Sequence, residues 1–163
     1  MSEKDIIVPE LKIDVRNSSF QMHELVKIVR SWSDLNKYIL IEKTYSDKDL
    51  ATGKDVNIFW TLKKDVDDYT SFQIDLKFYM KGRHINIKRK GRGIKGDIKV
   101  LFAGILIADK DSRWETPFYH ILRSFYDAFF QRDKFKAYSA KLDSEVNNLY
   151  NEVKAFLNLH AEK

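Results

Sequence analysis

Apolar residues recur at every second position through the middle of the chain. The longest run, residues 72–80, alternates polar residues and one tyrosine with Phe72, Ile74, Leu76, Phe78 and Met80. A period of two is typical of a half-buried strand, because successive side chains of a strand point to opposite faces. Shorter alternating runs lie at residues 58–62, 85–87 and 98–102. We predict an antiparallel meander, with a tight turn at Lys81-Gly82 and a mobile, glycine-rich hairpin turn at residues 91–96.

A helical pattern lies before this meander. From Met22 to Leu35 the apolar residues are spaced by three or four positions, which is the period of an amphipathic helix. Ser18 or Ser19 offers a hydroxyl N-cap. The spacing therefore predicts a helix over about residues 19–37.

Two further strands are expected beside this helix. Residues 6–15 alternate loosely and contain Pro9, which is best tolerated at a sheet edge or a bulge. Residues 38–45 are rich in β-branched and aromatic side chains, as strands are. Residues 46–54 are mostly polar and predict a loop.

The C-terminal part predicts a long helical segment. Thr116-Pro117 is typical of a helix start, and aromatic residues then occupy almost every face. A straight helix over residues 117–159 would be about 65 Å long, whereas a globule of this size has a radius of gyration of about 15 Å. We therefore expect a kink near residues 131–134, or an overhang that attracts a partner helix or a second copy. The seam for such a partner comprises Phe135, Tyr138, Leu142, Val146, Leu149, Val153 and Phe156.

These elements predict one α+β domain over residues 1–163. A curved antiparallel meander of five to six strands would pack on the long, kinked C-terminal helical segment, with one N-terminal helix. In element order this arrangement is similar to a helix-grip fold, in which a sheet wraps a C-terminal helix and can leave an apolar cavity. That similarity implies candidate cavity walls at Trp60, Phe72, Phe78, Phe102, Phe118, Phe125 and Phe129. The alternative is that these aromatic rings fill the core.

Composition narrows the chemistry that this chain can perform. The chain has 163 residues and no cysteine, which excludes disulfides, thiolate catalysis and cysteine-ligated metals. No apolar run approaches the length of about 20 residues that crosses a bilayer, and the first residues do not resemble a signal peptide. We expect a soluble, cytoplasmic protein.

Positive charge is concentrated in one segment. Residues 81–99 hold eight basic residues against one acidic residue, a net charge of +7; since the whole chain carries +5, the remainder carries −2. A local field of this kind attracts polyanions such as nucleic acids. The candidate anion-binding residues are Arg83, Lys88, Arg89, Lys90, Arg92, Lys95 and Lys99. The alternative is that exposed lysines protect strands from edge-to-edge pairing.

Within this basic segment, residues 91–96 match the pattern G-x-G-x-x-G. A dinucleotide-binding loop needs a helix after the glycines, because the helix N-terminus supplies amide donors to the pyrophosphate. Here a strand is predicted to follow, so that interpretation fails. Two interpretations remain: a simple hairpin turn, or a loop whose amides and Arg92 contact phosphates.

No arrangement typical of an enzyme is found. The four histidines form no metal-binding motif, and no nucleophile elbow is present. Residues 109–115 lack the spacing of a calcium loop. We expect no metal and no cofactor, and interpret the chain as a non-enzymatic binding module for nucleic acid or another polyanion. The alternatives are an assembly module using the C-terminal seam and a carrier of a hydrophobic small molecule.

Overall fold

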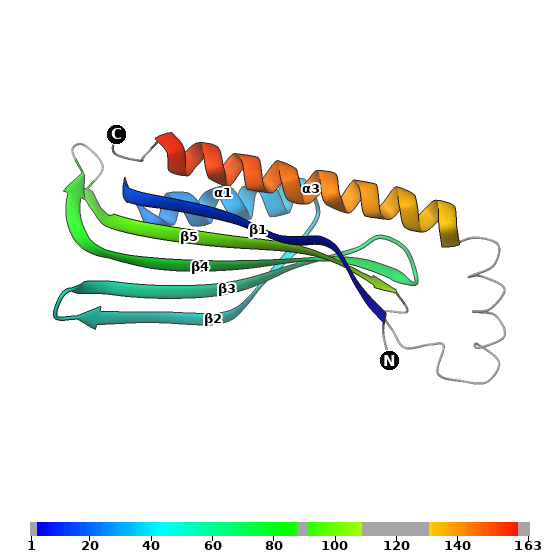
Figure 1. Cartoon of the computed structure of the whole chain (residues 1–163), viewed down its shortest axis with the longest axis horizontal. Helices are drawn as coiled ribbons and strands as arrows, with labels where there is room; N and C mark the ends of the chain where they lie inside the picture. Colours follow the sequence, from blue (N-terminus) through cyan, green and yellow to red (C-terminus); the bar gives the residue numbers. More distant parts are fainter. Residues whose placement is uncertain (1–2, 88–90, 109–130, 160–163) are drawn as a thin grey trace.

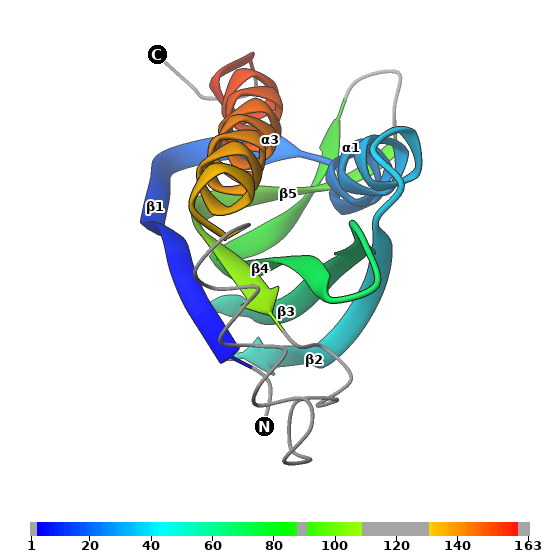
Figure 2. The ribbon, with the colours of Figure 1, turned by 90° about the vertical axis from the view of Figure 1, so that its right-hand side faces the viewer.

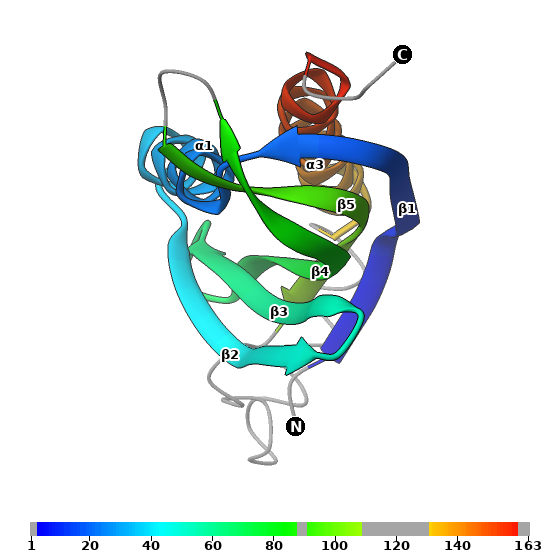
Figure 3. The ribbon, with the colours of Figure 1, turned by 90° about the vertical axis from the view of Figure 1, so that its left-hand side faces the viewer.

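Five antiparallel strands and two helices make up the computed structural model, which describes residues 3–87, 91–108 and 131–159 (Figure 1). The elements are β1 (Glu3–Phe20), α1 (Met22–Leu35), β2 (Ile39–Leu50), β3 (Gly53–Asp65), β4 (Thr70–Ile87), β5 (Gly91–Ala108) and α3 (Gln131–Leu159). The strands form one open sheet in the order β1-β5-β4-β3-β2. Both helices lie on the same side of this twisted sheet, as the end views show (Figures 2 and 3). The predicted α+β class, antiparallel sheet and long C-terminal helix are confirmed.

The alternating runs form the core as predicted. In the pairing of β3 with β4, Trp60 stands opposite Leu76 and Leu62 opposite Ile74, and none of these side chains is more than 3% exposed. Directly paired residues project from the same face of a sheet, so one face collects the apolar side chains. That face packs on the helices, and we call it the helix face.

The apolar stripe of α3 is buried against the chain's own sheet. Leu142, Val146, Leu149 and Val153 are fully buried, and α3 contacts β1, β5 and α1. Gly104 of β5 leaves room for this contact, since a Cβ there would lie 3.0 Å from Cγ2 of Val146. Most of the seam expected to face a partner helix is therefore inside the core.

The two ends of that seam differ in their burial. At the C-terminal end Phe156 is 9% exposed and stacks edge-on against Phe20. At the N-terminal end Phe135 is 36% exposed, and the hydroxyl of the half-buried Tyr138 donates a hydrogen bond to Asp67 at 2.8 Å. The predicted kink involves residues on both sides of Gln131, and those before it lie outside the described residues.

The N-terminal helix begins later than predicted. Its N-cap is Gln21, whose side chain forms no capping hydrogen bond, whereas Ser18 and Ser19 belong to β1. The predicted serine cap is wrong because both serines pair with β5, Ser18 with Gly96 and Ser19 with Lys95. Ser18 is fully buried in that pairing.

Strand boundaries also differ from the prediction. β2 continues through most of the segment expected to be a loop and ends at Leu50, so only Ala51 and Thr52 connect it to β3. Lys81 and Gly82 form no turn, because β4 continues through them to Ile87. The runs on either side of Lys81-Gly82 are thus one strand.

A buried polar cluster joins α3 to the sheet. Nζ of Lys64 lies 2.7 Å from Oε1 of Glu145, and the Tyr38 hydroxyl donates a hydrogen bond to the other oxygen of Glu145. The Lys64 ammonium also lies 4.6 Å from the centre of the Tyr38 ring. Burial, together with the adjacent Glu145 carboxylate, raises the pKa of Tyr38 above its ordinary value.

Candidate anion-binding surface

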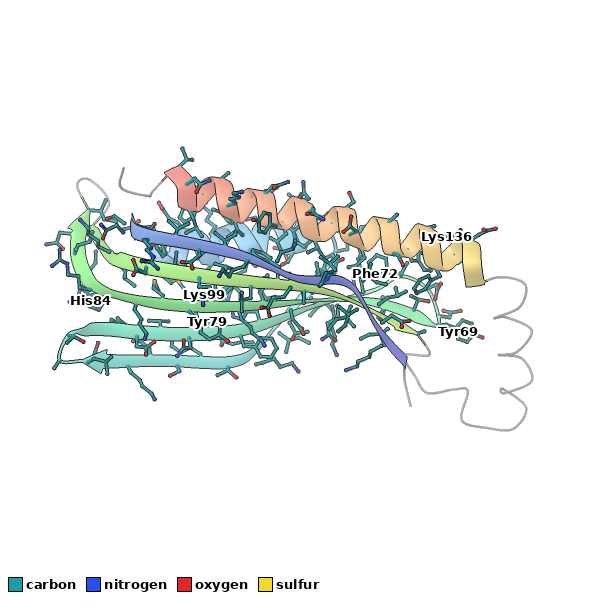
Figure 4. All side chains as sticks on the ribbon, viewed as in Figure 1. Tyr69, Phe72, Tyr79, His84, Lys99 and Lys136 are labelled. Carbon is teal, nitrogen blue, oxygen red and sulfur yellow. The ribbon has the colours of Figure 1, made fainter. Side chains whose placement is uncertain are left out.

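Three glycines allow a close approach of strands at one end of the sheet. A Cβ on Gly53 would overlap the carbonyl oxygen of Gly82, one on Gly82 that of Lys95, and one on Gly96 that of Lys81. Gly82 and Gly96 are directly paired across β4 and β5. In this region β4 and β5 bend toward the helix side while the β2–β3 hairpin continues straight, with His84 in the bent part (Figures 1 and 4). The glycines permit this geometry because they carry no side chain.

Basic side chains of β4 and β5 project from the face opposite the core. Arg83 is directly paired with Lys95, and Tyr79 with Lys99, without any register shift along the two strands. Their even-numbered neighbours Met80 and Ile98 are buried beneath the helices. Since side chains alternate along a strand, the odd-numbered basic residues share the outer face. Figure 4 marks Tyr79 and Lys99 close together on this part of the sheet.

A hollow of about 400 Å³ lies on this face at the bend, and we call it the cationic notch. Its basic outer-face lining comes from Lys81, Arg83 and Lys95, and no acidic residue borders it. Lys54 also borders the notch, but its amine binds Asp47 at 3.0 Å on the helix face. The notch is thus bounded by residues of all five strands and of the β2–β3 turn.

Two basic residues of the notch stand directly opposite each other on paired strands. Like charges placed directly opposite on paired strands destabilise a sheet, and Arg83 and Lys95 are such a pair. Among the described residues, neither Arg83, Lys81 nor Lys99 forms an ion pair. A bound anion would relieve this repulsion.

A second hollow, of about 670 Å³, continues along the same face from Lys81. Here the charges are balanced, because three basic side chains are accompanied by three acidic ones: Arg16, Lys81 and Lys99 with Asp14, Asp55 and Asp97. Tyr79 borders this hollow and is 43% exposed. The excess positive charge of the surface is therefore located at the cationic notch.

The predicted anion-binding residues are divided between two faces. Arg83, Lys95 and Lys99 share the outer face, whereas Arg92 is paired with Asn86 on the helix face. The segment 91–96 is not a hairpin turn: it begins β5, with Gly93 and Ile94 buried. The remaining candidates, Lys88, Arg89 and Lys90, lie outside the described residues.

Lys81 is an outer-face basic residue of the notch that the sequence interpretation missed. It was assigned to a turn because a glycine follows it. The signal that could have placed it is its odd-numbered position, in phase with Lys77 and Tyr79 on the polar side of β4.

Four of the aromatic residues considered as cavity walls are buried in the core. Trp60, Phe72, Phe78 and Phe102 are at most 3% exposed, and the rings of Trp60 and Phe78 meet edge to face at 5.1 Å between centroids. Neither hollow described above is lined by them. The other three candidates, Phe118, Phe125 and Phe129, lie outside the described residues, so the hydrophobic carrier stays a prediction.

Two further observations concern metals and membranes. Across residues 3–87, 91–108 and 131–159 there is no group of three or more His, Asp or Glu side chains that could hold a metal ion. Neither α1 nor α3 has the length and apolar composition of a membrane-spanning helix.

Comparison with known proteins gives no relative: no protein-family model matches the chain, and no curated protein matches its sequence.

Proposed function

We propose that this protein binds a polyanion at the cationic notch, and that the phosphate backbone of a nucleic acid is the favoured ligand. The observation that carries the proposal is the direct pairing of Arg83 with Lys95 in a hollow that no acidic residue borders. A phosphate between these side chains would make an attractive contact with each of them.

The chemistry of the surrounding side chains supports this choice of ligand. The planar guanidinium of Arg83 can donate two hydrogen bonds to one phosphate, and Lys81 supplies a mobile point charge two positions away on the same strand. Tyr79, half exposed beside Lys99, offers an aromatic face for one unstacked base. Most of these side chains would contact the phosphate backbone rather than the bases, so binding is expected to depend weakly on base sequence.

The test is the salt dependence of binding to an unspecific fluorescent oligonucleotide, measured by anisotropy on the full chain. Neutralising about three backbone phosphates predicts that the logarithm of the association constant falls with the logarithm of salt with a slope of about −3. The double variant Arg83→Glu/Lys95→Glu should make this slope less negative by about two. It should also weaken binding at low salt by about tenfold or more.

A matched control separates the notch from the overall charge. Lys27→Glu/Arg30→Glu changes the net charge by the same amount on an exposed part of α1, on the other side of the sheet. This control should retain the slope and most of the affinity. Equal losses in both variants, or no binding at low salt, would refute the proposal; stronger competition by heparin than by DNA would identify a different polyanion.

A further inference from the structure

Strand β2 is an open edge of the sheet. Among the residues that the structure describes, it pairs with β3 alone, and α1 contacts it. Its exposed side chains include Ile39, Tyr45 and Leu50, which are 70%, 57% and 50% exposed. An edge strand of 12 residues with exposed apolar side chains is a template for pairing with another strand.

We propose that this edge pairs with the β2 edge of a second copy of the chain, antiparallel and centred on Tyr45. The sequence of β2 is self-complementary about that residue. Tyr45 stands opposite Tyr45 of the second copy, Thr44 opposite Ser46, and Lys43 opposite Asp47. The result is one continuous ten-stranded sheet with a twofold axis through the tyrosine pair.

The side chains fit each other at each of these positions. In the register with β3, Tyr45 and Asp47 project on the helix face, whereas Thr44 and Ser46 project on the outer face. The two tyrosines thus meet on one face, and the two hydroxyl pairs meet on the other. Both Lys43–Asp47 pairs bring opposite charges together, and because the interface is isologous each favourable pair occurs twice.

Charge also disfavours one alternative register. Moving the axis to Asp47 would place two Asp47 carboxylates opposite each other, which is repulsive. On the other side, the register shift between Glu42 and Thr44 limits regular pairing to the part of the strand after the bulge. The axis at Tyr45 uses that regular part, which begins at Thr44, and joins Lys43, the bulge residue just before it, to the aspartate.

The absence of cysteine from the chain makes the register directly measurable. A single cysteine in Tyr45→Cys would lie opposite its own copy, at a separation that suits a disulfide. In Ile39→Cys the cysteine lies six positions from the axis on the same strand, so the two copies would be about 40 Å apart. Mild oxidation should cross-link the first variant about tenfold faster or more than the second, because pairing raises the effective concentration of the thiols.

Several outcomes would overturn the proposal. Equal cross-linking of the two variants, or faster cross-linking of Ser46→Cys than of Tyr45→Cys, contradicts the register. Sedimentation of the unmodified chain as a monomer at high concentration contradicts the dimer itself.

A charge exchange tests the same interface independently of cysteine. Lys43→Asp and Asp47→Lys each place like charges across the axis, so each variant alone should sediment as a monomer. A mixture of the two restores opposite charges and should form a heterodimer. Asp47 also pairs with Lys54 in its own chain, so Asp47→Lys can lose stability, but recovery of a dimer on mixing cannot come from a folding defect. Failure of the folded variants to associate on mixing overturns the proposal.

Discussion

Lys64 and Glu145 form an ion pair that water hardly reaches, with side chains 13% and 14% exposed. Removing two charges from water is costly, and here the cost is offset by the short contact, by the Tyr38 hydroxyl and by the aromatic ring beneath the ammonium. The pair connects β3 to α3 and so fixes where the long helix lies on the sheet.

Removing one partner of this ion pair should strongly destabilise the protein. Lys64→Met leaves a buried carboxylate without its partner and is expected to cost about 3–5 kcal/mol in the free energy of unfolding, measured in urea. The double variant Lys64→Met/Glu145→Leu should recover most of that loss. The control is Lys12→Met, which removes an exposed pair with Asp14 at 3.9 Å and should cost less than about 1 kcal/mol. A loss in Lys64→Met no larger than in this control would disprove the role of the buried pair.

At the scale of elements, the glycines of β3, β4 and β5 shape the surface. They lie where strands approach so closely that a methyl group would overlap a backbone carbonyl. This backbone contact brings the turn after β2 next to Lys81 and Arg83, and so forms the border of the cationic notch. The notch is thus a consequence of sheet curvature as well as of charge.

Gly96→Ala should therefore destabilise the protein and weaken polyanion binding together. Its Cβ would overlap the carbonyl oxygen of Lys81, and an overpacked site of this kind costs about 2–3 kcal/mol. Gly104→Ala, in the same strand, meets only side-chain carbons at 3.0–3.2 Å, which can move, and should cost about 1 kcal/mol without affecting binding. Thermal unfolding measures the change in stability, and the anisotropy assay measures the change in binding. Equal effects of the two variants would contradict this account.

Element prediction succeeded where the pattern was long and failed at the glycines. The apolar alternation at residues 58–62 and 72–80 reports burial on one face directly, so these parts of β3 and β4 were predicted correctly. Gly82 and Gly96 were interpreted as turn residues because a glycine in a turn and a glycine in a close strand contact look alike in sequence. The two cases differ in whether a partner strand lies beside the glycine, as Gly96 lies beside Gly82 here. The local sequence does not reveal that pairing.

On the scale of the whole molecule, the open sheet separates two environments. One face is covered by α1 and α3 (Figure 2) and holds the core. The other carries the odd-numbered charged residues of β4 and β5. A concentration of positive charge in residues 81–99 was evident from the sequence. Its division between faces was not: Arg92 lies on the helix face, whereas Lys81 joins Arg83 and Lys95. Assigning these faces requires the strand boundaries that the glycines obscured.

The measurement that tests the central claim most directly is a nuclear magnetic resonance titration of the ¹⁵N-labelled full chain with a short single-stranded oligonucleotide at low salt. The largest changes in amide chemical shift should occur at Lys81, Arg83 and Lys95, and at Gly53 at the start of β3, and should disappear at high salt. Changes centred on α1 or on the N-terminal half of β1, or no changes at all, would contradict the account.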